Sequence, residues 1–181
     1  RASKEIPDVV MLVVTVKALK YNGGMLIENI AEESMEYLEE GIVNLERHIL
    51  NLKRFGIPIV VCINKFKTDT VKEIEFIKEF CNKFGIISEI STAYEEGSEG
   101  AVELAKIVCN IADNSKTDFK YTYEDDDDIE EKIYKVCKYV YGASKVNYSK
   151  EALQKLEKIK KMDASNRLPV CIAKTPMSFT D

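Results

Sequence analysis

The chain has 181 residues, of which 45% are hydrophobic and 31% charged, a composition typical of a folded globular protein. Its formal net charge of −5 argues against a nucleic-acid partner, because phosphate backbones are bound by basic surfaces. No apolar run approaches the roughly 20 residues that a membrane-spanning helix requires, so no membrane partner is expected. We expect a soluble protein of the cytoplasm, with the mitochondrion as the alternative compartment.

Two dense apolar runs, at residues 8–16 and 57–63, predict strands that are covered on both faces, as inside a parallel sheet. The second run is expected to be the middle strand. Between them, apolar residues recur at helical spacing over residues 27–55. Because such a crossover is right-handed, the loops that follow the strands, 17–24 and 64–69, should open on the same edge of the sheet.

The rest of the chain continues the alternation of strands and helices. Thr70 and Glu73 have the spacing of a capping box and predict a helix start. The later elements are predicted as a strand at 86–91, a loop at 92–100, helices at 102–112, 129–140 and 153–159, and a last strand at 168–173. We therefore predict an α/β fold, a mostly parallel sheet flanked by helices in a P-loop-NTPase-like (Rossmann-like) architecture with a small helical excursion. The expected parts are a core at 1–113, an acidic polar linker at 114–128, and residues 129–181, which return to the same α/β unit.

Side chains that often form metal or redox sites are scattered. His48 is the single histidine and falls mid-helix, so a zinc site or a His-based triad is not expected. The acidic run at 124–128 is interpreted as a solvated loop whose last carboxylates favour the next helix, with a cation site as the alternative. No metal site is predicted. The cysteines lie singly in apolar patterns and are expected to be buried, reduced thiols: Cys62, Cys81, Cys109, Cys137 and Cys171.

The strand-end loops carry the candidate binding residues. Phe66 and Tyr94 are aromatic residues in neighbouring loops, and they either pack into the core or sandwich a flat heterocycle. Gly97 precedes a helix N-terminus that suits a phosphate or carboxylate, although a plain turn is an equal alternative. The paired Gly23 and Gly24 allow close approach of a ligand.

A nucleotide-binding loop is only partly matched. Asn64 and Lys65 at a strand end resemble the guanine-binding loop of P-loop GTPases, but Lys67 stands where that signature needs Asp, and the nearest carboxylate is Asp69. The sequence also contains no GxxxxGK[ST] phosphate loop, which excludes a self-contained nucleotide hydrolase. Two residues at the end of the last predicted strand either meet a phosphate or are solvated: Lys174 and Thr175.

Residues 13–24 are Val-Val-Thr-Val-Lys-Ala-Leu-Lys-Tyr-Asn-Gly-Gly. This run resembles the signature Val-Ala-Thr-(Ile/Val)-Arg-Ala-Leu-Lys-x-(His/Asn)-Gly-Gly of the formate–tetrahydrofolate ligases and departs from it at Val14 and Lys17. Further segments resemble that family in the same order, at 41–49, 55–58, 63–70 and 168–175. The resemblance extends from about residue 8 to residue 181 and is more specific than any one motif.

The resemblance implies that the parent protein joins formate to tetrahydrofolate with ATP and Mg²⁺, through formyl phosphate, and releases 10-formyltetrahydrofolate, ADP and phosphate. It implies that Phe66 and Tyr94 hold the pterin ring, with Lys67 and Gly97 in the same folate site. The candidates for the nucleotide or phosphate crevice are Asn64, Lys65, Asp69, Lys174 and Thr175.

The sequence departs from the family in ways that bear on function. Lys67 replaces a Pro and Tyr94 replaces a Trp, which should loosen the loop and reduce the stacking surface. The family's phosphate loop lies N-terminal to the matched segments, and the chain begins with Arg1 rather than Met, so we interpret it as a piece of a longer ligase. We expect it to be inactive alone and identify no catalytic residue in it. The alternative is a non-catalytic folate-binding or interaction module; an unrelated P-loop-like nucleotide enzyme has only fold analogy behind it. Homo-oligomerisation is left open.

Overall fold

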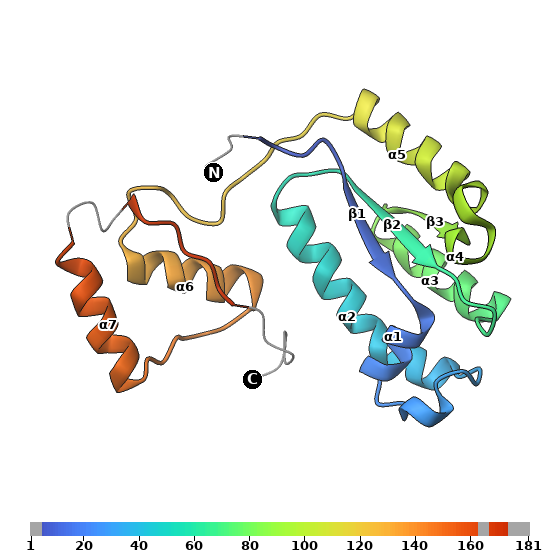
Figure 1. Ribbon diagram of the computed structural model, residues 1–181, viewed down its shortest axis with the longest axis horizontal. Coiled ribbons are helices and arrows are strands. Elements are labelled where there is room, and N and C mark those ends of the chain that lie inside the picture. Colours follow the sequence, from blue (N-terminus) through green and yellow to red (C-terminus); the bar gives the residue numbers. More distant parts are fainter. Residues whose placement is uncertain (1–4, 163–166, 174–181) are drawn as a thin grey trace. The chain divides into compact units, whose positions relative to one another are not determined.

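The computed structural model describes residues 5–162 and 167–173. The chain divides into two compact units, Arg1–Phe119 and Lys120–Asp181. Within the described residues, the first unit holds a three-stranded sheet with the order β1-β2-β3 (Figure 1). Its strands are β1 (Val10–Val14), β2 (Ile59–Asn64) and β3 (Ile87–Ser91), and both pairings are parallel. The predicted α/β class and the central place of the second apolar run are therefore confirmed.

The helices of the first unit follow the strands in the order expected of strand–helix–strand crossovers. They are α1 (Val16–Asn22), η1 (Ile27–Asn29), α2 (Met35–Arg54), α3 (Val71–Lys83), α4 (Ala93–Glu96), η2 (Gly97–Ala101) and α5 (Val102–Asn114). The long predicted helix thus begins at Met35, after the short 3₁₀ turn of η1.

The core is built on both faces of β2, because successive side chains of a strand point to opposite faces. Ile59, Val61 and Ile63 pack with buried residues of α1, α2 and α3. Val60 and Cys62 face the other way, against α5. β1 is less enclosed than its apolar sequence predicted, since Met11 and Val13 remain about half exposed on the same face as Val60 and Cys62.

Residues 17–24 are not a loop as predicted. They form most of α1, which follows at the tip of β1 (Figure 1). The helix starts because the Thr15 hydroxyl accepts a hydrogen bond from the Ala18 amide (3.0 Å) and because Leu19 finds a place in the core. Gly23 serves this packing, because a Cβ on it would lie 2.0 Å from the Tyr37 carbonyl oxygen of α2, whereas Gly24 has a φ of +96° and no close neighbour.

The second unit contains α6 (Ile129–Val140) and α7 (Lys150–Lys160). Asp128, the last residue of the acidic run, caps α6 by accepting a hydrogen bond from the Glu131 amide (2.8 Å), as the sequence predicted. Among the described residues, no helix is both long and apolar enough to cross a membrane.

Residues 168–173 do not form the predicted strand. Their backbone groups are bound by side chains instead of by a neighbouring strand. The Tyr123 hydroxyl donates to the Val170 carbonyl (3.2 Å) and accepts from the Val170 amide (2.9 Å), and the Lys132 ammonium donates to the Leu168 carbonyl (3.3 Å). Pro169 also lacks the N–H that a strand ladder requires.

The prediction of buried cysteines is correct for Cys62 and Cys81 and wrong for Cys109 and Cys171, which are exposed. Cys109 lies off the face by which α5 packs, which is formed by Leu104, Ile107, Val108 and Ile111. All five cysteines are free thiols.

Candidate functional site

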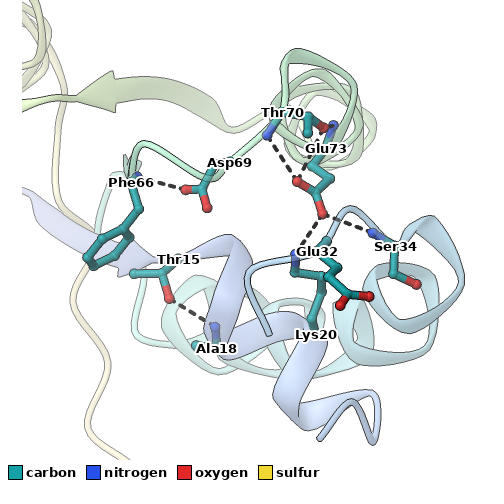
Figure 2. Close-up of polar contacts among 9 residues, drawn as sticks. All are labelled: Thr15, Ala18, Lys20, Glu32, Ser34, Phe66, Asp69, Thr70 and Glu73. Carbon is teal, nitrogen blue, oxygen red and sulfur yellow. Dashed lines mark hydrogen bonds and ion pairs between the residues drawn. The ribbon is translucent and has the colours of Figure 1, made fainter. Parts of the chain in front are cut away.

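The carboxyl ends of the strands meet at one edge of the sheet because the strands are parallel. β2 leads there into a tight turn at residues 66–69, which we call the pocket turn. The Asp69 amide donates to the Phe66 carbonyl (3.0 Å), and the Asp69 carboxylate accepts from the Phe66 amide (2.8 Å; Figure 2). The turn is therefore closed from both sides, and it is joined to β3 through the Lys65 amide and the Ser91 carbonyl (3.0 Å).

The geometry of the pocket turn explains how the chain tolerates Lys67. This residue occupies the second position of the turn, where Pro would fix the backbone dihedral φ in advance. The bond from the Phe66 amide to the Asp69 side chain supplies an alternative restraint. The turn thus keeps its shape without the Pro, by a side-chain hydrogen bond.

An aromatic cavity lies beside the pocket turn. Its volume is about 400 Å³, within the range of small-molecule sites. The ring centroids of Phe66 and Tyr94 are 6.5 Å apart with an interplanar angle of 39°, and the Lys17 ammonium lies 4.5 Å from the Phe66 centroid. Tyr94 is 85% exposed, whereas Phe66 is half-buried. The lining residues are Lys17, Phe66, Lys67, Thr68, Tyr94 and Glu95.

Asp69, the last residue of the pocket turn, is buried. Only 7% of it is exposed, and its Oδ1 atom has no hydrogen-bond partner among the described residues. Burial raises the pKa of the Asp69 carboxyl, and the charge of Glu73 raises it further. The Phe66 amide and the charges of Lys17 and Lys20 lower this pKa, but the net shift is upward.

A second buried carboxylate stands at the start of α3. Thr70 and Glu73 form the predicted capping box, which is confirmed. Glu73 is fully buried and pairs with Lys20 of α1, Oε1 to Nζ at 2.8 Å. Burial raises the pKa of Glu73, but hydrogen bonds from Lys20, Thr70 and Ser34, together with the charge of Lys20, outweigh burial and lower the pKa below its ordinary value of 4.5.

The structure brings only some of the predicted site residues together. Phe66, Lys67 and Tyr94 line the aromatic cavity, and Asn64 and Lys65 lie at the end of β2 but do not line it. Lys174 and Thr175 lie outside the described residues.

Gly97 is exposed, with φ of +63°, and begins η2 rather than α5. The neighbouring Gly100 permits a close backbone contact, because a Cβ there would lie 2.6 Å from the Thr92 carbonyl carbon. Gly100 therefore serves local geometry, and Gly97 has no close neighbour at its Cβ position.

Sequence reasoning missed Lys17, Thr68 and Glu95 as cavity residues. In the sequence, Lys17 stands out only as a departure from the family signature, and residues 17–24 are predicted to be a loop. In helix α1, Lys17 falls above the Phe66 ring. Among the described residues, no group of His, Cys, Asp and Glu side chains could hold a metal ion.

A comparison with protein families places these features in context. The family model described as formate–tetrahydrofolate ligase matches residues 1–181, the whole chain.

Proposed function

The chain belongs to the formate–tetrahydrofolate ligase family, and we propose that its first unit supplies the tetrahydrofolate pocket of that reaction. The observation that carries the proposal is the meeting of Phe66 and Tyr94 at a 400 Å³ cavity on the carboxyl edge of the sheet. Aromatic faces on two sides of a cavity suit a flat heterocycle such as a pterin.

The spacing of the Phe66 and Tyr94 rings suits a pterin after a small movement of the Tyr94 ring. A flat ring held between two others needs about 7–8 Å between the outer rings, twice the optimal carbon–carbon separation. The observed 6.5 Å and 39° fall slightly short of that arrangement. Tyr94 lies on the short helix α4 and is mostly exposed, so its ring can turn parallel to Phe66 and open the gap.

The charges around the cavity fit an anionic ligand that carries a ring. Lys17 and Lys67 both line it, opposed by Glu95. Tetrahydrofolate combines a pterin with the carboxylates of its glutamate tail. We therefore propose that the rings bind the pterin and that the lysines favour the negative charge. Gly97 remains a weaker candidate for the same site.

In the complete protein we propose the reaction of the family. A formate oxygen attacks the γ-phosphorus of ATP, which forms formyl phosphate and releases ADP. N10 of tetrahydrofolate then attacks the formyl carbon, the bond from that carbon to the phosphate oxygen breaks, and phosphate and the N10 proton are released. We keep Asn64 and Lys65, at the end of β2, as candidates for phosphate contacts. Asp69 is better suited to holding the pocket turn, because its buried negative charge would repel a phosphate. We assign no Mg²⁺ ligands to the described residues.

The test is substitution of each ring in the complete natural protein. Phe66→Ala and Tyr94→Ala should raise the KM for tetrahydrofolate, Phe66→Ala by about tenfold, since a stacked ring contributes roughly 0.5–1.5 kcal/mol beyond its buried area. The KM for ATP should stay unchanged. Tyr37→Ala, which removes a partly exposed ring from α2, is the control.

An unchanged KM for tetrahydrofolate in both variants would contradict the stacking role. Binding of tetrahydrofolate without any ATP-dependent product in the complete wild-type protein would instead favour the alternative, a folate-binding module that has lost catalysis.

A further inference from the structure

Lys20 and Glu73 form an ion pair that solvent does not reach. Their side chains are 1% and 0% exposed, and Lys20 Nζ lies 2.8 Å from Glu73 Oε1. Removing two charges from water costs several kcal/mol per ion, so a buried pair contributes little net stability compared with apolar residues of the same volume. The pair therefore calls for an explanation other than stability.

Both groups of the pair are bound on several sides by other segments. Lys20 Nζ also donates to the Glu32 carbonyl (2.7 Å), and Glu73 Oε1 accepts from the Ser34 amide (3.3 Å). Glu73 Oε2 accepts from the amide (3.0 Å) and the hydroxyl (3.2 Å) of Thr70. Figure 2 shows α1, residues 32–34 and the start of α3 converging on this one carboxylate.

The Lys20–Glu73 ion pair connects α1 to the start of α3, the two segments next to the residues of the aromatic cavity. On α1, Lys17 and Lys20 are three positions apart and so share a helix face, and Lys17 Nζ lies 4.5 Å from the Phe66 ring. On the other side, Glu73 fixes the first turn of α3 through Thr70, directly after the pocket turn that carries Phe66. The contact between Lys20 and Glu73 thus ties α1, which packs on α2, to the start of α3 directly after the pocket turn.

We propose that Lys20 and Glu73 are positioning residues of the tetrahydrofolate pocket, which hold Lys17 and Phe66 at their binding distance. This inference rests on the proposed function of the cavity. The pair acts through Phe66 and touches no substrate itself. Asp69 belongs to the same arrangement, because its carboxylate accepts a hydrogen bond from the Phe66 amide.

The test replaces both charged side chains with uncharged side chains of similar volume. In the complete protein, Lys20→Met with Glu73→Gln removes both charges, keeps side-chain volume and leaves an amide oxygen to accept from Thr70. We expect a folded protein in which the KM for tetrahydrofolate rises by roughly tenfold, the cost of a small misplacement in a binding site, while the KM for ATP is unchanged. The matched control makes the same two changes at a partly exposed pair, Lys78→Met with Glu89→Gln, and should leave both constants unchanged.

A double-mutant cycle separates positioning from a general loss of structure. If the pair acts through Phe66, its replacement in a Phe66→Ala background should change the KM for tetrahydrofolate by less than twofold. An independent, full rise in that background, or no rise in the wild-type background, would overturn the inference.

The outcomes also distinguish this inference from the proposed function. If neither Phe66→Ala nor Tyr94→Ala has an effect, the proposed function fails; if Phe66→Ala has an effect and the pair variant does not, only the positioning role fails. Should the double variant not fold, Glu73→Gln alone answers the same question: its one amide oxygen can still accept from Thr70, whereas the amide nitrogen that replaces Oε1 cannot accept from Lys20, so the ion pair is lost and the helix cap is kept.

Discussion

Two buried carboxylates lie close together in the sequence, Asp69 in the pocket turn and Glu73 in the first turn of α3, and their pKa values shift in opposite directions. Both lose water. Glu73 gains Lys20 and hydrogen bonds to both of its oxygens, whereas Asp69 keeps one oxygen without a partner. Burial raises the pKa of both carboxyls, so the difference lies in their partners: at Glu73 the donated hydrogen bonds and the charge of Lys20 outweigh burial, and at Asp69 the partners do not.

The largest expected effect comes from breaking the better-satisfied carboxylate. Glu73→Ala leaves Lys20 buried and unpaired and removes half of the capping box, so we expect the free energy of unfolding to fall by about 3–5 kcal/mol. Denaturant unfolding followed by circular dichroism measures this loss. Glu103→Ala removes a carboxylate from an exposed pair and should cost no more than about 1 kcal/mol. Equal losses in the two variants would contradict the comparison.

The pH dependence of stability should have opposite signs at the two sites. The pKa of Glu73 is lowered, so its contribution is present above its unfolded value of 4.5 and is lost as the pH falls through the lower folded pKa. The pKa of Asp69 is raised, so its charged form costs stability as the pH rises from 3.8 through the higher folded pKa.

Two conservative variants measure these signs in denaturant titrations between pH 3 and pH 7. Relative to wild type, Glu73→Gln should be less stable at pH 7 than at pH 3, and Asp69→Asn should be more stable at pH 7 than at pH 3. Asn can still accept the hydrogen bond from the Phe66 amide, so the pocket turn is kept. Differences of the same sign would show that the two carboxylates are not distinguished by their partners.

The smallest expected effect comes from a change at Lys67 in the pocket turn, whose backbone the Asp69 side chain already restrains. Lys67→Pro should raise the free energy of unfolding by about 0.4–1 kcal/mol, because Pro at the second turn position restricts the unfolded chain. Thermal unfolding detects the gain. Lys65→Pro is the matched control and should destabilise, since the Lys65 amide donates to the Ser91 carbonyl. A loss of stability in Lys67→Pro would show that the Asp69 restraint and a Pro are not interchangeable.

Features that depend on local pattern could be predicted from the sequence. The middle strand can be identified because β2 is apolar at nearly every position. The spacing of Thr70 and Glu73 indicates the start of α3. Phe66 and Tyr94 could be placed in neighbouring loops because parallel strands end on one edge. These inferences need only the hydrophobic periodicity of the sequence and the rules of sheet topology.

Several misses involve partners distant in the sequence. Residues 168–173 have the composition of a strand, but Tyr123 and Lys132 bind their backbone first. Lys20 and Glu73 are separated by 53 positions, so no local pattern reveals that they pair. Lys17 was missed as a cavity residue because its helix is fixed by packing on α2, which the sequence of α1 does not show.

The glycine contact between α1 and α2 has a consequence for inherited variation. A side chain at Gly41 would place its Cβ 1.8 Å from the Leu19 carbonyl oxygen, and one at Gly23 meets the Tyr37 carbonyl in the same way, so either change must push α1 aside. Because α1 carries Lys17 and Lys20, a chain that survives such a change would hold these two side chains away from Phe66 and Glu73. Under the proposed function the resulting defect would be a higher demand for tetrahydrofolate, which a larger cellular supply of reduced folate could offset.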